Sequence, residues 1–378
     1  MTALPEERPR QSRCHDARIV PHLGDNADMT HIVTLAASGK HFEVQAGETV
    51  LEAAQRAGLA LSYSCLAGVC GSCKATLISG ECAYPRNPPA ALSAAERARD
   101  AVLLCQAVPN TDLVIAAREV ASVEDLPRRV VTARVVAKDP LAEDMIRLRL
   151  QTSPRLRWLP GQYLDVLLED GRRRAFSIAL APHLGPQLEL HVRHVAGGGF
   201  TSYVFNELKV GDTLRVEGPL GTFVPREDSE RPMILMAGGA GFAPIKALIE
   251  HFVHLGTRRA MHLYWGARAA SDLYLRELPS QWAREAERLE WQAVLSDPES
   301  AKVENLRAGL VHEAVLEDHA DLSAFDVYMS GPPAMIDAGR RAFVEAGLPE
   351  DRLYYDSFDY APDVLAQILS NRAGIHGL

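Results

Sequence analysis

Four cysteines are the residues of this chain whose spacing most directly suggests chemistry. Cys65, Cys70 and Cys73 lie within the stretch SCLAGVCGSCKA, and Cys105 follows in LLCQA. Clustered thiols can form disulfides, hold a structural zinc ion or ligate a redox-active metal centre. Six cysteines in 378 residues are far fewer than a disulfide scaffold contains. Structural zinc sites usually present two C-x2-C pairs, whereas the stretch holds one, so a redox-active centre is the favoured interpretation.

The order of these cysteines is C-x4-C-x2-C followed by one distant cysteine, which is the ligand spacing of plant-type [2Fe–2S] sites. The residues between them are mostly small, which suits a loop whose backbone N–H groups must approach the sulfurs. The spacing therefore predicts a [2Fe–2S] cluster on these four thiols. The remaining cysteines have no place in the pattern: Cys82 is expected to be a small buried hydrophobic residue, and Cys14 a free surface thiol.

A second group of residues, in RRRAFSIA, could bind one ligand between them. Arg174, Phe176 and Ser177 would lie on a strand and its end. The arginine can pair with a phosphate, the aromatic ring can stack on a ligand, and the hydroxyl can reach a ring nitrogen. The alternative from the residues alone is a solvated arginine beside a core phenylalanine.

Two glycine-rich segments can each bind a phosphate group, because glycines that lead into a helix N-terminus form an anion site. In the first, HVRHVAGGGFTSYVF, Gly197 and Gly198 precede Thr201, where a helix would begin. In the second, MILMAGGAGFAPIKALIEH, an apolar strand is followed by three glycines and then a proline in the first helical turn: Gly238, Gly239, Gly241 and Pro244.

Three blocks of different pattern would position these residues. Residues 30–120 read as a small α+β unit that contains the cysteine loop. Residues 128–227 hold short alternating strands that predict an antiparallel β-barrel, with one helix in FTSYVFNEL. Residues 230–378 alternate strands and helices, which predicts an α/β domain with a parallel sheet. Residues 1–28 show no periodicity and are expected to be a disordered extension.

Composition excludes some partners. The net charge of -9 argues against nucleic acid, whose phosphates require basic surface. No stretch of about 18 apolar residues is present, so we expect no membrane span. The N-terminus lacks the apolar core of a signal peptide, which favours a cytoplasmic protein.

The motifs together resemble known families. YSCLAGVCGSCKATLISGE with LLCQAVPNTDLVI is similar to a plant-type ferredoxin domain, which implies a β-grasp fold and a [2Fe–2S] cluster. PGQY at 160–163, RRRAFSIA, the Gly198–Thr201 turn and EGPLGTF at 217–223 resemble the FAD-binding barrel of the ferredoxin–NADP reductase superfamily. This resemblance implies that FAD is bound by Arg174, Phe176, Ser177, Gly198 and Thr201.

The last block resembles the nicotinamide domain of the same superfamily. Its turn has that superfamily's G-G-x-G-x-x-P form, and YMSGPPAM is similar to C-G-P-x-x-M. The resemblance implies that Ser330, Gly331 and Pro332 lie near the nicotinamide, with Ser330 in place of the usual cysteine. Phe358 in YYDSF is a candidate to pack on the flavin, the alternative being a core residue. NADH is favoured as the donor, although Arg268 could pair with the 2′-phosphate of NADPH.

The resemblance implies a one-chain reductase that passes electrons from NAD(P)H to FAD, then to [2Fe–2S], and finally to an acceptor protein. It is most similar to CDP-6-deoxy-Δ3,4-glucoseen reductases, which implies a dehydratase component as the partner. Reductase components of aromatic or alkane mono- and dioxygenases share most of the motifs. We nominate no catalytic side chain, because the cofactors carry the chemistry. Two other classes remain open: a stand-alone flavin enzyme that reduces a small molecule, and a carrier whose flavin site has been lost.

Overall fold

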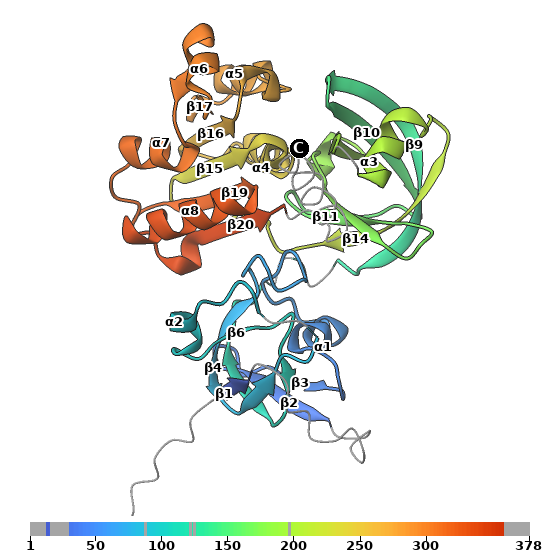
Figure 1. Cartoon of the computed structure of the whole chain (residues 1–378), viewed down its shortest axis with the longest axis vertical. Coiled ribbons are helices and arrows are strands. Elements are labelled where there is room, and N and C mark those ends of the chain that lie inside the picture. The colour runs from blue at the N-terminus through green and yellow to red at the C-terminus, as the bar shows by residue number, and fades with distance from the viewer. Residues whose placement is uncertain are drawn as a thin grey trace, which may run out of the picture. The chain divides into compact units, whose positions relative to one another are not determined.

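The computed structural model describes residues 13–15, 30–86, 89–120, 123, 126–195 and 198–358. The chain divides into two compact units, Met1–Asp125 and Leu126–Leu378, drawn in Figure 1. The second and third predicted blocks thus pack together as one unit. Among the helices formed by the described residues, none has both the length and the hydrophobicity needed to cross a membrane.

The first unit is built on a five-stranded mixed sheet with the order β3-β2-β8-β4-β6. Its strands are β2 (His31–Leu35), β3 (His41–Val44), β4 (Lys74–Ser79), β6 (Ala101–Leu103) and β8 (Leu113–Ala116). Strands β2 and β8 are parallel, and the other neighbours are antiparallel. Helix α1 (Val50–Arg56) begins at a capping box of Thr49 and Glu52 and buries its apolar side in the core. This is the β-grasp arrangement that the ferredoxin resemblance implies.

A smaller sheet joins β1 (Arg13–His15), β5 (Glu81–Ala83) and β7 (Val108–Pro109), and α2 (Ala94–Arg97) precedes β6. Strand β1 pairs in parallel with β5 so that Cys14 lies opposite Cys82, and the two form a disulfide. The expectation of a free thiol at Cys14 is therefore wrong, because the strand pairing brings two distant cysteines together. Cys82 is fully buried, as expected. Apart from residues 13–15, which form a strand where no regular structure was expected, the predicted extension lies outside the described residues.

The second unit begins with an antiparallel barrel in the order β12-β11-β14-β9-β10-β13. The strands are β9 (Arg129–Ala142), β10 (Met145–Ser153), β11 (Tyr163–Leu167), β12 (Arg173–Ser177), β13 (Leu188–Arg193) and β14 (Thr213–Leu220). A bridge from Ile178 to Leu190 links the two ends of the sheet and closes it. Side chains alternate along β10 between the core and the outside, as a barrel requires. Helix α3 (Gly199–Asn206) packs against this core.

The rest of the unit is a six-stranded parallel sheet in the order β18-β17-β16-β15-β19-β20. The strands are β15 (Met233–Gly238), β16 (Met261–Ala267), β17 (Leu289–Leu295), β18 (Arg307–Ala308), β19 (Asp326–Gly331) and β20 (Leu353–Ser357). Helices α4 (Phe242–His254) and α5 (Glu277–Glu285) share one core with the sheet, and α7 (Val311–Asp318) and α8 (Pro333–Glu345) share another. Helix α6 (Pro298–Glu304) connects β17 to β18. In Figure 1 the carboxyl ends of β19 and β20 point towards the barrel.

Candidate functional site

The four predicted cluster cysteines come together in the first unit. Cys70, Cys73 and Cys105 are buried, Cys65 is half-buried, and all four are free thiols. They lie as two hydrogen-bonded pairs, Cys65 with Cys70 and Cys73 with Cys105. Within the described residues, no group of three His, Cys, Asp or Glu side chains is arranged around one metal-ion position. Two pairs of thiols are the donor set that a two-iron cluster needs, with two sulfurs for each iron.

The surroundings of these thiols favour a thiolate in each pair. The hydrogen bond from Cys70, together with N–H groups of Ala67 and Val69, outweighs burial and lowers the pKa of Cys65 to about 5. A hydrogen bond from Cys73 likewise lowers the pKa of Cys105. The thiolate is the form that ligates a metal. The same pairing and burial raise the pKa values of Cys70 and Cys73, so these two thiols would lose their protons when a metal binds.

The backbone of the loop is shaped to approach the sulfurs. The N–H of Ala67 lies 3.4 Å from Cys65 Sγ, and the N–H of Ser72 lies 3.4 Å from Cys70 Sγ. Gly68 has a φ of +78°, and a Cβ there would lie 2.8 Å from Gln106 Cγ. Only glycine adopts this conformation without strain at so close an approach. These donors fit a cluster whose sulfurs accept backbone hydrogen bonds.

Gln106 is a residue at this site that the sequence interpretation did not find. It is buried, and its Nε2 donates to Leu66 O at 3.1 Å and lies 3.8 Å from Cys105 Sγ. Its buried Oε1 has no hydrogen-bond partner among the described residues. The side chain thus joins the loop to the distant cysteine. The only sequence signal for a role of Gln106 at this site is its position directly after Cys105.

The predicted flavin residues lie on β12 in the second unit. Phe176 packs in a tilted arrangement on Phe200 of α3, with ring centroids 5.6 Å apart. The Arg174 side chain donates to Arg173 O at 2.9 Å. Ser177 is buried, and its hydroxyl donates to Asp356 Oδ2 at 3.4 Å. The strand therefore brings an aromatic face, a guanidinium and a hydroxyl to one region.

The turn before α3 has the form expected of an anion site. Thr201 Oγ1 accepts from the N–H of Val195 at 3.1 Å and donates to Gly198 O at 3.2 Å. A Cβ at Gly198 would lie 2.8 Å from Thr201 Oγ1, so this tight turn requires glycine. The fold thus provides a cradle of the kind a flavin pyrophosphate needs. Gly197 lies outside the described residues.

The predicted nicotinamide turn joins β15 to α4. Gly238 ends the strand, Gly239 and Gly241 form the turn, and Pro244 lies in the first turn of the helix. A Cβ at Gly241 would lie 2.1 Å from Ser330 O. The turn therefore packs backbone to backbone against the end of β19, and the helix N-terminus behind it favours a pyrophosphate.

Ser330, Gly331 and Pro332 end β19 and lead into α8. Ser330 is fully buried, and its Oγ has no hydrogen-bond partner within the described part of the chain. It pairs in register with Asp356 of β20. Ser177, Ser330 and Asp356 thus meet where the barrel adjoins the carboxyl end of the parallel sheet.

Asp356 is a second residue that the sequence interpretation missed, although it stands in the quoted YYDSF. It is buried and contacts Ser177 of the flavin motif. Phe358 follows β20; it is half-buried, and its N–H donates to Gly331 O at 2.9 Å. Arg268 follows β16 and is exposed, and its carbonyl accepts from the N–H of Asp297.

Comparison with protein families assigns a class to each part. A 2Fe-2S iron-sulfur cluster binding domain matches residues 33–110, an oxidoreductase FAD-binding domain residues 132–224, and an oxidoreductase NAD-binding domain residues 235–341. The protein is therefore an iron–sulfur flavoprotein oxidoreductase that uses a nicotinamide nucleotide.

Whole-chain relatives define the family. The chain is 37% identical over 328 residues to the CDP-6-deoxy-L-threo-D-glycero-4-hexulose-3-dehydrase reductase of Yersinia pestis, which covers 86% of this chain and 98% of the relative. It is 35% identical to terephthalate 1,2-dioxygenase reductase component 2 of Comamonas sp., over 88% of this chain and 99% of the relative. The crystal structure of the Amycolatopsis cytochrome P450 reductase GcoB matches with a TM-score of 0.70 and 34% identity, over 87% and 99%. This chain belongs to the family of one-chain ferredoxin–NAD(P)H reductase components.

Proposed function

We propose that this protein supplies electrons from NADH, through FAD and the [2Fe–2S] cluster, to a CDP-6-deoxy-hexulose dehydrase. The observation that carries the choice of partner is the 37% identity that extends over 98% of the Yersinia reductase, and so over all three cofactor domains. The bound cofactors supply the redox chemistry: the flavin accepts two electrons together, and the cluster passes on one at a time.

The side chains of this protein bind the cofactors and orient them. In the proposal, Arg174 and the Gly198–Thr201 turn hold the phosphates of FAD, while Phe176 packs on the bound cofactor. Ser177, held by Asp356, presents its hydroxyl where the strand ends. Phe358 covers the flavin from the end of β20.

The nicotinamide nucleotide is proposed to bind across the ends of β15 and β19. Gly238, Gly239 and Gly241 receive its pyrophosphate, and Ser330, Gly331 and Pro332 form the edge nearest the nicotinamide. We propose NADH rather than NADPH as the donor. Arg268 is the residue to substitute if the 2′-phosphate proves to matter, since an Arg268→Ala variant would then lose affinity for NADPH alone.

An oxygenase is the second candidate partner. Two observations support it: the 35% identity to the terephthalate dioxygenase reductase and the 34% identity to the P450 reductase GcoB, both over nearly the whole relative. These values are close to the 37% of the first candidate. The choice between the two partners therefore needs an experiment.

The experiment has two stages. Purified protein, reduced anaerobically with NADH, should lose both flavin and iron–sulfur absorbance; a protein that keeps both bands contradicts the proposed electron route. The reduced protein is then mixed with either a CDP-6-deoxy-hexulose 3-dehydrase or a terephthalate dioxygenase, each with its substrate. We expect the first to reoxidise the cluster faster. If the protein reduces a small-molecule acceptor without either partner as fast as it reduces the partner proteins, the result would favour a stand-alone flavin enzyme.

We also propose a cytoplasmic location, because the free thiols of Cys65, Cys70, Cys73 and Cys105 must stay reduced in order to ligate a cluster. Disulfides such as Cys14–Cys82 are rare in a reducing cytoplasm. We therefore expect Cys14 to be largely reduced in cells. Thiol alkylation before lysis should label Cys14, and its protection, with the protein in a periplasmic fraction, would contradict the location.

A further inference from the structure

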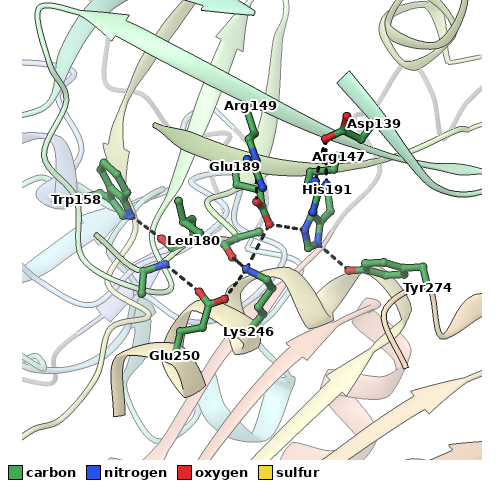
Figure 2. A network of polar contacts seen from close by, with 12 residues as sticks. Asp139, Arg147, Arg149, Trp158, Leu180, Glu189, His191, Lys246, Glu250 and Tyr274 are labelled. Atoms are coloured by element: carbon green, nitrogen blue, oxygen red, sulfur yellow. Dashed lines mark hydrogen bonds and ion pairs between the residues drawn. The ribbon is translucent and has the colours of Figure 1, made fainter. Parts of the chain in front are cut away.

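A charged group is buried between the barrel and the nicotinamide part of the second unit. Lys246 extends from α4 towards the barrel, and its side chain is 7% exposed. Its Nζ lies 2.7 Å from Glu250 Oε1 of the same helix and 3.2 Å from Glu189 Oε1 of β13. Figure 2 shows the lysine between these two carboxylates. One ammonium group thus connects the helix to the barrel wall.

The same group binds the backbone that follows the flavin motif. Lys246 Nζ donates to Ala179 O at 2.8 Å, and the N–H of Ala181 donates to Glu250 Oε2 at 3.1 Å. Between them, Leu180 O accepts from Trp158 Nε1 at 2.9 Å (Figure 2). The backbone of residues 179–181 is therefore fixed by hydrogen bonds to side chains from other parts of the fold. This segment starts two residues after Ser177, so its position sets where the flavin-binding strand ends.

The carboxylate on the barrel side is kept charged. Burial alone would raise the pKa of Glu189, but the hydrogen bond from His191 and the charge of Lys246 lower it to about 2. Burial lowers the pKa of His191. A neutral His191 ring with its proton on Nε2 satisfies both neighbours. Its Nε2 donates to Glu189 Oε1 at 3.1 Å, and its Nδ1 accepts from the Tyr274 hydroxyl at 3.0 Å. Tyr274 belongs to the nicotinamide part, so the network crosses between the two parts a second time.

The network lies beside a cavity of about 880 Å3. Glu189 and Arg149 line it from the barrel, and Lys246, Glu250 and Tyr274 line it from the other side. Apolar side chains of the barrel, such as Met145 and Phe223, pack into the core of the nicotinamide part, whereas beside this cavity the two parts are joined by charged and polar groups. A buried ion pair adds little net stability, whereas it is strongly directional. The ion-pair network therefore serves to align the barrel with the nicotinamide part rather than to stabilise the contact between them.

We propose that Lys246 is a positioning residue for hydride transfer: it aligns the flavin-binding strand end of the barrel with the helix whose N-terminus adjoins the nicotinamide turn. This inference rests on the proposed electron route from NADH to FAD. In that step the hydride leaves NADH with both electrons, giving NAD+ and reduced flavin. Lys246 touches neither reactant and acts through Ala179 and the first turn of α4.

The test is the Lys246→Met variant in the full-length holoprotein, with Lys302→Met as a matched control on the exposed side of α6. Flavin reduction is followed anaerobically by stopped flow, with NADH and with NADH deuterated at the transferred hydrogen. A misalignment of about 1 Å costs on the order of 100-fold in rate. We expect a fall of about 10- to 100-fold at saturating NADH, a larger deuterium isotope effect, and an NADH Kd within about threefold of the unsubstituted protein.

Removal of Lys246 alone leaves two buried carboxylates together, which can unfold the protein. The Lys246→Met/Glu250→Gln variant avoids this, since Glu189 keeps Arg149 and His191 and the glutamine can still accept from Ala181. It should fold, retain FAD and remain slow. An unchanged reduction rate and isotope effect in either folded variant overturns the inference. If the unsubstituted protein itself is not reduced by NADH, the proposed function fails instead.

Discussion

Gly241 offers a sharp test of the nicotinamide site, because its neighbour is backbone that cannot move aside. A Cβ at this position would lie 2.1 Å from Ser330 O, whereas Cβ atoms essentially never approach closer than 3.0 Å and ordinary contacts lie at 3.4–4 Å. The Gly241→Ala substitution must therefore separate the glycine turn from the end of β19 by about 1 Å. A displacement of that size costs on the order of 100-fold in a positioned reaction, or about 2.7 kcal/mol.

The assay is the rate of anaerobic flavin reduction as a function of NADH concentration. We expect the ratio of rate to NADH Kd to fall about 100-fold in Gly241→Ala, while FAD and iron contents stay the same, because the barrel and the cysteine loop are untouched. The matched control is Gly256→Ala. Gly256 follows α4 with a φ of +61° and nothing within 4 Å of an added Cβ.

The control separates strain from site geometry. Alanine in the left-handed conformation at Gly256 should lower the free energy of unfolding by about 1 kcal/mol and leave NADH kinetics unchanged. If Gly241→Ala reacts with NADH within twofold of the unsubstituted protein, the backbone contact with Ser330 does not define the nucleotide site and the reasoning is refuted.

Three further predictions concern the cluster, the flavin side chains and pH. Cys70→Ser should lose the iron–sulfur absorbance and keep flavin reduction by NADH, while the buried control Cys82→Ala keeps both; iron analysis decides, and two irons retained in Cys70→Ser would contradict the ligand assignment. Asp356→Asn should retain FAD but slow its anaerobic reduction about tenfold, because the hydrogen bond that orients Ser177 is weakened; an unchanged rate would remove Asp356 from the site. The pKa of Glu189 is lowered from 4.5 to about 2, so its stabilising contribution is present above pH 4.5 and is lost as pH falls towards 2. Chemical unfolding at several pH values should show this slope flattened in Glu189→Gln and unchanged in the control Glu290→Gln, whose side chain is 81% exposed; equal slopes in both variants would show that Glu189 does not titrate as described.

Much of the site was predictable where the relevant residues are close in sequence. Three of the predicted cluster ligands, Cys65, Cys70 and Cys73, lie within one loop, so their spacing reports directly on the geometry that two irons require. The glycines of the turn after β15 were also predictable, since a strand, a tight turn and a helix N-terminus form one local unit. The alternating patterns of the barrel block likewise matched β9 to β14, because a barrel buries every second residue.

The contacts that were missed join distant segments. Cys14 pairs with Cys82 across 68 residues, and neither position carries a local signal of its partner. The Ser177–Asp356 hydrogen bond spans 179 residues and exists because the barrel adjoins the end of the parallel sheet. Lys246 reads from its neighbours as an ordinary helical residue, yet it is buried against the barrel.

Short motifs were enough to predict which cofactors this protein holds, because most residues of each motif lie within a few positions of one another. Which of the proposed site residues lie together, and which partners position them, depends on the tertiary structure. Residues such as Asp356, Gln106 and Lys246 gain their roles from partners brought close by sheet closure and packing. Those contacts depend on the whole fold, so no local pattern encodes them.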